Sequence, residues 1–280
     1  MRSHRLRAAA GNAAGGIITS NLEIYYDFGN TSCYNSSVST TAVTDLSGNG
    51  NNATYQNTHL GSPTFNSSNG GYVSISNANI FLKKDSGTSI YDIGTGSYTI
   101  EFFMNLTAIN SYHIFDSFVQ GFAPGDILES HYFIIQPRAS SSLNDYRLRG
   151  KGLTGSSSKA NQQYTNFNTG ASQSAPPFYD IDVNSYYGSS TPTTGWEHFV
   201  VSRENTSSNG IKFYRNGSVI RTSTSGINYN ENLYVYYGNK EEYMKNQGNY
   251  AIMRVYIGKG LTSTEVTQHY DFEKARFGLT

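Results

Sequence analysis

The chain has 280 residues, of which 20 are basic and 20 acidic, so its formal net charge is zero. This length suits one large β domain with appendages, and the balanced charge argues against nucleic-acid binding, which needs a basic surface. No segment approaches the roughly 18 consecutive apolar residues of a membrane span. The 28 glycines, 23 tyrosines and 15 phenylalanines instead indicate a β-rich chain with many turns.

Residues 1–20 are expected to form a flexible N-terminal arm. The arm is rich in Ala and Gly and offers little apolar surface to bury, so it should be disordered unless a partner binds it. Arg2, Arg5 and Arg7 give it a positive charge that the neutral body lacks. The arm is therefore either a floppy tail or a docking element that uses these arginines on a partner surface.

Several segments of the next part alternate between apolar and polar residues, as half-buried strands do. Strands are expected, in chain order, at 22–27, 72–77, 98–105, 109–119 and 131–136. Phe103 lies among the otherwise polar positions of the third segment, which predicts that both faces of this strand are covered. The Asx and Gly residues of 45–53 predict a tight, ordered turn.

The stretch 150–194 shows no hydrophobic period and is rich in Ser, Asn, Gln and Gly. This composition predicts an extended loop insertion that contains a short hairpin. Long loops in compact domains are usually functional or mobile. The body therefore reaches from residue 21 to residue 280 with an insertion near 150–194.

Regular alternation returns beyond Trp196, which is expected in the core. Strands are predicted at 198–203, at 211–220 with the turn described next inside it, and at 251–257. Inside the second of these, Asn216-Gly217 predicts a hairpin with a type I′ turn, because both central residues of that turn need positive φ.

The end of the chain carries the signals of one helix. Thr262 and Glu265 have the spacing of a capping box, and Gly278 lies where a helix C-terminal cap is expected. No βαβ alternation occurs, which excludes a parallel doubly wound sheet. The fold class predicted is all-β, with two packed antiparallel sheets and one short C-terminal helix.

Three groups of segments resemble concanavalin A-like, laminin-G-like jelly-roll domains. They are 21–35 with 44–53, then GWEHFVVSR at 195–203 with IKFYRNGSV at 211–219, and finally 256–279, which ends in ARFGL. The last segment resembles the version found in structural proteins of tailed bacteriophages and large viruses. The resemblance covers most of 21–280 apart from about 115–194, and it implies a jelly-roll sandwich that often binds glycans or proteins through loops at one sheet edge.

The resemblance also includes sandwich glucanases, which place Glu, Asp and Glu at alternate positions of one strand. The nearest match here is Asp180-Ile181-Asp182, and it lacks the flanking carboxylates, while Glu241 and Glu242 are adjacent and would point to opposite sides of a strand. The six histidines show no metal-ligand spacing, and the single cysteine, Cys33, is expected to be a small packing residue. We therefore expect a protein that is not an enzyme.

Some relatives hold a calcium ion at the rim of the sandwich. Asp27, Asp45, Asn49 and Asn51 offer the hard oxygens that this ion prefers. The alternative, which we favour, is a turn that hydrogen-bonds to itself. Many relatives have an Asp before Arg-Ile-Tyr in the last strand, and the Met253 found here argues against the ion, so no metal or other cofactor is expected.

The candidate binding residues are tyrosines in polar, loop-like surroundings. An aromatic ring can stack on the apolar face of a sugar, and tyrosine is also enriched at protein interfaces and in cores. Of these alternatives, we favour a protein interface over a sugar site. The residues are Tyr186, Tyr187, Tyr234, Tyr236, Tyr237 and Tyr243.

Two functions are expected from the resemblance and the missing carboxylates. The first is a non-enzymatic virion protein, displayed on the capsid or tail as a decoration or attachment module and anchored to other virion proteins partly by the arm. Such a protein assembles in the host cytoplasm, which the lone cysteine permits. The second is a carbohydrate-binding module for host surface glycans; a glycoside hydrolase ranks last. Neither nucleic acid nor membrane is an expected partner, and the sequence leaves homo-oligomer formation open.

Overall fold

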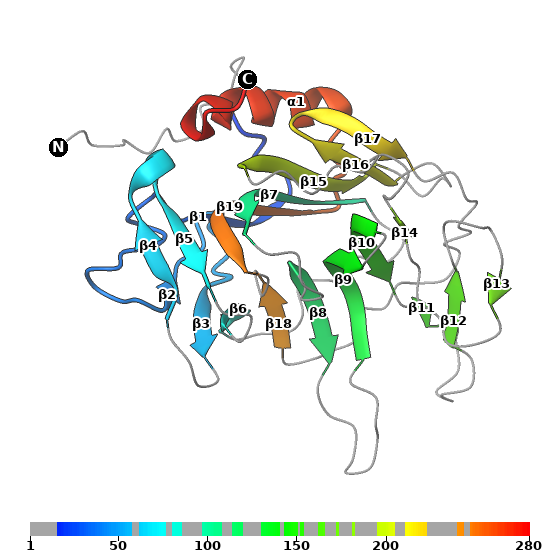
Figure 1. Cartoon of the computed structure of the whole chain (residues 1–280), viewed down its shortest axis with the longest axis horizontal. Coiled ribbons are helices and arrows are strands. Elements are labelled where there is room, and N and C mark those ends of the chain that lie inside the picture. The colour runs from blue at the N-terminus through cyan, green and yellow to red at the C-terminus, as the bar shows by residue number, and fades with distance from the viewer. Residues whose placement is uncertain are drawn as a thin grey trace, which may run out of the picture.

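The computed structural model describes most of the sandwich, in sections separated by gaps. The described residues are 16–57, 62–76, 80–85, 97–107, 114–119, 130–140, 143–150, 152–153, 162–165, 172–173, 181–182, 195–204, 211–222, 240–243 and 247–280. They form two large antiparallel sheets and a helix that lies across the outer side of one sheet (Figure 1). The prediction of an all-β, two-sheet sandwich with one short C-terminal helix is confirmed.

The first sheet has eight strands and contains most of the alternating segments of the sequence. Its order is β17-β16-β15-β7-β19-β5-β4, and β1 pairs with the C-terminal part of β19. The strands are β1 (Leu22–Asp27), β4 (Thr64–Asn66), β5 (Tyr72–Ile75), β7 (Tyr98–Leu106), β15 (Glu197–Arg203), β16 (Ile211–Arg215), β17 (Ser218–Thr222) and β19 (Gly248–Ile257).

The second sheet also has eight strands, in the order β14-β10-β9-β8-β18-β6-β3-β2. Of its strands, the sequence predicted β8 and β9, whereas the others were missed. The strands are β2 (Ala42–Val43), β3 (Ala53–Asn57), β6 (Ile80–Lys84), β8 (Phe115–Val119), β9 (Ser130–Ser140), β10 (Leu143–Gly150), β14 (Ile181–Asp182) and β18 (Lys240–Tyr243).

The predicted insertion contains more pairing than one short hairpin. Within its described residues, β12 (Gln162–Thr165) pairs with both β11 (Gly152–Leu153) and β13 (Ser172–Gln173) in a three-stranded sheet. The strand β14 instead pairs with β10 and extends the second sheet. Strands of two to four residues are too short to produce a readable period in the sequence.

The main core lies between the two sheets. In β1, buried and half-buried residues alternate, so one face packs inward, whereas all of β15 and nearly all of β7 is buried on both faces. Phe103 is fully buried and stacks on Phe277 at 5.0 Å between ring centroids, which confirms that the outer face of β7 is covered. Cys33 is buried in the main core, as expected of a packing residue, and its burial raises the pKa of its thiol.

The cover of the outer face is α1 (Ser263–Glu273), continued by the 3-10 turn η3 (Lys274–Phe277); a second 3-10 turn, η1 (Ser68–Gly70), connects β4 to β5. The capping box is confirmed, because Thr262 Oγ1 accepts from Glu265 N and Glu265 Oε2 accepts from Thr262 N at 2.9 Å. Among the described helices, none is long and apolar enough to cross a bilayer.

The two glycine signals of the sequence are also confirmed. Gly278 ends η3 in the left-handed conformation with φ 67°. The hairpin between β16 and β17 turns at Asn216 and Gly217, with φ of 48° and 76°, the two positive values that a type I′ turn requires.

Candidate functional site

Most of the residues predicted to bind a partner lie outside the described part of the chain. These are Tyr186, Tyr187, Tyr234, Tyr236, Tyr237 and the arm residues Arg2, Arg5 and Arg7. Tyr243 lies in the strand β18, where it pairs with Leu82.

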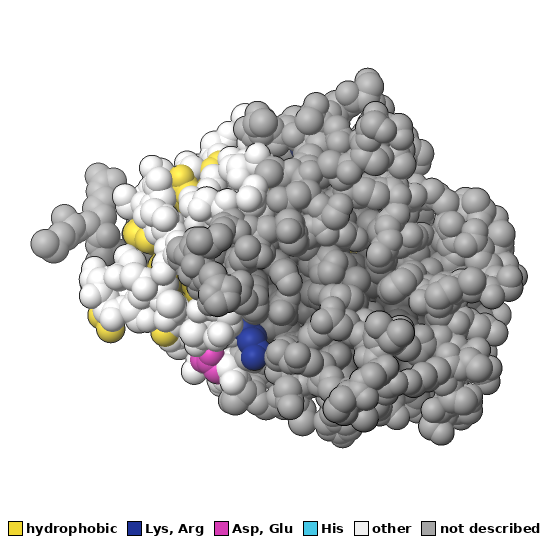
Figure 2. Space-filling model, turned by 60° about the horizontal axis from the view of Figure 1, so that its bottom comes forward, with side chains coloured by type: hydrophobic (Ala, Val, Ile, Leu, Met, Phe, Trp, Pro, Cys, Tyr) yellow, Lys and Arg dark blue, Asp and Glu magenta, His cyan; other side chains and the backbone are white. Residues whose placement is uncertain are grey.

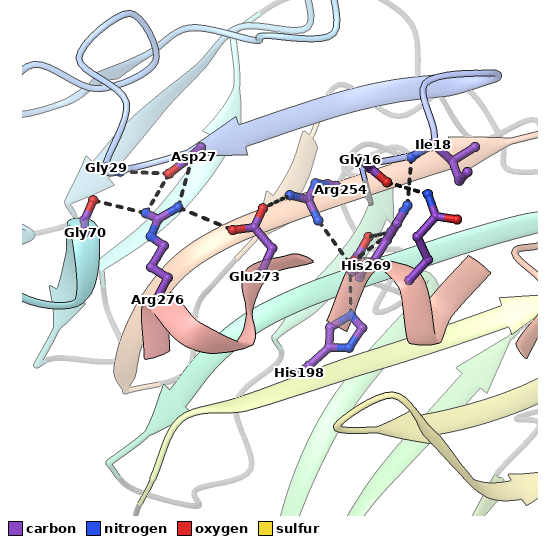
Figure 3. Close-up of polar contacts among 12 residues, drawn as sticks. Gly16, Ile18, Asp27, Gly29, Gly70, His198, Arg254, His269, Glu273 and Arg276 are labelled. Atoms are coloured by element: carbon purple, nitrogen blue, oxygen red, sulfur yellow. Dashed lines mark hydrogen bonds and ion pairs between the residues drawn. The ribbon is translucent and has the colours of Figure 1, made fainter. Parts of the chain in front are cut away.

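The last residues of the predicted arm, 16–20, are fixed to the sandwich. Ile17 and Ile18 pack against an apolar cluster under α1. Ile18 N donates to His269 Nε2 at 2.8 Å, and the Tyr256 hydroxyl donates to Ile18 O at 2.8 Å. The Gln268 amide donates to Gly16 O at 2.6 Å (Figure 3). Residues 16–18 therefore lie beside α1.

The turn proposed as an alternative to a calcium site hydrogen-bonds to itself. Asp45 Oδ1 accepts from Tyr25 N at 2.9 Å and Ser47 N at 3.0 Å, and its Oδ2 accepts from the Ser47 hydroxyl at 2.6 Å and Asn51 N at 3.0 Å. Both carboxylate oxygens are thus engaged by the protein. In the described residues, no group of three or more His, Cys, Asp and Glu is placed to hold a metal ion.

A buried polar network centred on Glu101 lies between β7 and α1. Glu101 Oε1 accepts from His198 Nε2 at 2.9 Å and from Arg254 Nη1 at 3.1 Å. Its Oε2 lies 3.0 Å from His269 Nδ1. All four side chains are fully buried, so a charged carboxylate is stable here only because two imidazoles and a guanidinium surround it (Figure 3).

The partners of the two imidazoles assign their protons. His269 accepts the Ile18 N–H on Nε2, so it carries its proton on Nδ1 and donates it to Glu101. His198 donates from Nε2, and its Nδ1 is buried with no hydrogen-bond partner. Burial lowers the pKa of His198 despite its hydrogen bond with Glu101. Burial alone would raise the pKa of Glu101, but His269, Arg254 and His198 together hold it well below its usual range.

The network continues from Arg254 to the C-terminus. Arg254 Nη2 donates to Glu273 Oε1 at 2.5 Å, which ties β19 to the end of α1. Arg276 then binds Asp27 through two hydrogen bonds, of 3.0 and 2.8 Å, and donates from Nε to Asn69 O at 3.0 Å. This explains the arginine of the ARFGL segment, since a bidentate guanidinium joins β1, η1 and η3.

The Glu101 network joins β7, β15, β19 and α1 in the interior and is not exposed to solvent. Its carboxylate and both imidazoles have no solvent exposure, so no substrate can reach them. The sequence did not reveal the network because His198, Arg254 and His269 lie 97, 153 and 168 residues from Glu101 along the chain. The strand register supplies the missing step, because Glu101 pairs directly with Arg254, and His198 pairs with Phe103 on the same face of β7.

Trp196 differs from its predicted place in the main core. It is half-buried on the outer face of the first sheet, where it packs beside Phe103 and Phe277. Its ring lies 4.9 Å from that of Phe277 and 5.2 Å from that of Tyr72, with the last pair T-shaped. The Trp196 side chain is therefore accessible at the edge of the layer that α1 and η3 form.

No protein-family model and no curated protein sequence matches this chain. Among solved structures, the binding domain of Paraclostridial Mosquitocidal Protein 1 is similar, with a TM-score of 0.53 and 15% identity over 90% of this chain and 52% of that one. The botulinum neurotoxin serotype D binding domain gives 0.55 and 12%, over 91% and 51%. The chain thus spans about half the length of these two toxin chains.

A third similar structure is domain 4 of AbnA, a GH43 extracellular arabinanase from Geobacillus stearothermophilus, in complex with arabinotriose. It gives a TM-score of 0.52 and 15% identity over 88% of this chain and 97% of that domain. At these identities, the likeness shows the fold alone, a two-sheet β-sandwich. None of these three structures is a viral protein.

Proposed function

We propose that this chain is a carbohydrate-binding module without catalytic activity. The observation that carries the proposal is the complete burial of the Glu101, His198 and His269 group, the described constellation that most resembles an acid–base site. General acid–base catalysis requires its groups within hydrogen-bond reach of a substrate. A sandwich whose polar cluster is sealed in this way is suited to recognition.

The character of the described surface supports a neutral ligand. Charged residues make up 14% of the chain, well below the roughly 25% that is usual. On the face that Figure 2 shows, the described atoms are largely uncharged, with one basic and one acidic group near each other. Sugars present hydroxyl groups and apolar ring faces without charge, so they match a surface of this kind.

The similar structures add support of a second kind. The AbnA domain was solved with arabinotriose, and the toxin domains are binding domains. A domain with this fold thus occurs in complex with an oligosaccharide.

The full chain, tested on an array of neutral and acidic glycans that includes arabinotriose, should bind at least one glycan. Isothermal titration calorimetry should then give a saturable isotherm, and incubation with that glycan should release no reducing sugar. Absence of binding to every glycan would refute the carbohydrate-binding proposal. Release of product would refute the non-enzymatic part alone.

A second candidate function is display on a virion, which rests on the position of the chain ends. Gln268 binds Gly16 O, and the Tyr270 hydroxyl donates to Thr280 O at 2.7 Å, so both described ends lie beside α1. A module held through this side would present its other surfaces to a partner. The arm arginines, the virion location and host-cytoplasm assembly belong to this proposal.

Removal of residues 1–15 tests the display proposal more sharply than removal of 1–20, because residues 16–18 contribute packing to the domain. The truncated chain should keep its melting temperature and lose incorporation into particles, as measured by mass spectrometry of purified particles. Normal incorporation would remove the anchoring role of the arm.

A further inference from the structure

The outer face of the first sheet carries a patch of aromatic and amide side chains next to the end of η3. We call it the Trp196 patch, and all of its members are half-buried. It consists of Tyr72, Ser74, Asn105, Trp196 and Asn249.

The strand register brings these residues to one face. Asn249 of β19 pairs with Ser74 of β5 on one side and with Asn105 of β7 on the other. The first pair between β15 and β7 joins Glu197 to Met104, so Trp196, one residue earlier, continues the register opposite Asn105. Residues opposite one another in adjacent strands project from the same face.

The aromatic part of the patch is held in place from behind. Trp196 packs on Phe277 and meets Tyr72 in a T-shaped contact at 5.2 Å and 70°. Both residues are half-buried, so each keeps some contact with solvent. Rings fixed by packing lose little conformational entropy when a ligand stacks on them, which favours binding.

The polar part of the patch has unused hydrogen-bonding groups. Ser74 Oγ donates to Asn249 Oδ1 at 2.6 Å, which orients this amide and leaves its N–H groups available. The Asn105 side chain makes no hydrogen bond within the described part of the chain. Two amides that can both donate and accept suit the hydroxyl groups of a sugar.

The patch itself carries no charged side chain. Arg276 lies over the Phe277 ring at 5.2 Å, but Asp27 neutralises it through two hydrogen bonds. An anionic ligand would therefore find no free cation in the patch. The neutral character points to an uncharged ring that can stack and hydrogen-bond at once.

We propose that the Trp196 patch is a binding subsite for a neutral sugar ring of an oligosaccharide. The ring stacks against Trp196 and Tyr72, while Asn105 and Asn249 hydrogen-bond to its hydroxyl groups. This inference rests on the proposed carbohydrate-binding function and assigns to it a location and a ligand class. Sequence analysis placed the candidate tyrosines elsewhere, so the two locations can be tested against each other.

Trp196 is the only tryptophan of the chain, which makes its fluorescence a specific probe of the patch. The full chain is titrated with neutral trisaccharides of glucose, galactose and arabinose, each tested alone, and with the neutral glycans that bind on the array. A bound sugar should change the Trp196 emission saturably, with the same Kd that calorimetry gives.

Two variants and a control separate binding from folding. Asn105→Ala should weaken binding about three- to tenfold, the effect of one neutral hydrogen bond, with the melting temperature nearly unchanged. Trp196→Ala should lower affinity by more than tenfold, and far-ultraviolet circular dichroism checks its fold. Phe272→Ala removes an exposed aromatic ring of α1 and should leave affinity unchanged.

The outcomes distinguish the two proposals. Glycan binding that leaves the Trp196 emission and the Asn105→Ala affinity unchanged would refute the patch and retain the carbohydrate-binding function. A preference for acidic over neutral glycans would refute the ligand class. If no glycan binds the wild-type chain, both the carbohydrate-binding function and the Trp196 subsite are refuted.

Discussion

Glu101 and Asn105 lie four residues apart on the same face of β7, and they occupy opposite environments. Glu101 is fully buried under α1, where it meets two histidines and an arginine. Asn105 is half-buried beyond the end of η3, and its side chain makes no hydrogen bond to other described residues. One sheet face therefore has a sealed, charged half and an open, neutral half.

The comparison shows that packing of α1 and η3 over the first sheet determines which of its polar side chains are buried and which can meet a ligand. A buried carboxylate without partners is strongly destabilising, so the sealed half needs a complete set of donors. A neutral amide at a half-exposed position is solvated by water and can exchange that water for a ligand. The sealed half thus holds the fold together, and the open half is free to bind.

The largest effect is expected when the sealed half loses its charge balance. Glu101→Gln leaves the buried Arg254 with only Glu273 as a counter-ion, which should lower the free energy of unfolding by about 3–5 kcal/mol. Urea denaturation followed by circular dichroism measures it. The control is Asp271→Asn, which changes a carboxylate in an exposed pair with Lys274 and should have little effect. Equal effects of the two changes would contradict the structural role of the network.

The second prediction concerns the pH dependence of stability. Burial lowers the pKa of His198, so below about pH 6.5 the unfolded chain takes up a proton that the folded chain does not. Stability should therefore fall as the pH decreases from about 6.5, by up to about 1.4 kcal/mol per pH unit for this group.

Glu101 acts in the same direction at lower pH. Its folded pKa is depressed, so the stability that its charge provides is lost as the pH falls from the unfolded value of about 4.3 through the folded one.

Urea midpoints of the wild type and of His198→Gln, measured between about pH 5 and pH 7, isolate the histidine. The variant should show a smaller slope, and parallel slopes would exclude His198 as the source.

The third prediction tests the cover itself. Thr262→Ala removes the acceptor for Glu265 N at the start of α1, and this should cost about 1 kcal/mol. Thr264→Ala is the matched control, because Thr264 is an exposed threonine of the same first turn. Thermal unfolding of both variants gives the comparison, and an equal loss would show that the capping box contributes nothing specific.

The smallest effect belongs to the open half. Asn105→Ala should change the free energy of unfolding by less than about 0.5 kcal/mol, as surface substitutions usually do. Comparison of Asn105→Ala with Glu101→Gln measures the stability contribution of two positions on the same face of β7. A loss near that of Glu101→Gln would mean that Asn105 supports the fold, and the distinction between the two halves would fail.

Local chemistry made much of the fold predictable. The type I′ turn at Asn216-Gly217, the capping box of Thr262 and the ordered turn around Asp45 depend on residues close in sequence, and all three are confirmed. The long alternating strands were also predicted, since their periods extend over enough residues to be recognised. Short strands such as β2 and β14 were missed for the opposite reason.

The candidate sites could not be predicted in the same way. The spacing of His198 and His269 showed only that it is not the spacing of metal ligands, and a lone Trp196 before a regular strand indicated a core residue. The structure brings His198 to Glu101 and places Trp196 on the outer face because β7, β15 and β19 pair across more than 90 residues, and because η3 returns to the outer face of the sheet. Cross-strand neighbours are set by register, and one sequence leaves that register undetermined.

By itself, then, the sequence determined an all-β sandwich with one capped helix, a weakly charged, tyrosine-rich composition and the absence of the glucanase carboxylate pattern. These properties depend on residue types and on spacings within single elements. Only the tertiary structure decided which polar side chains are sealed beneath α1 and which remain open beside it. Burial depends on what packs over a residue, and at Glu101 and Asn105 the covering segments come from distant parts of the chain.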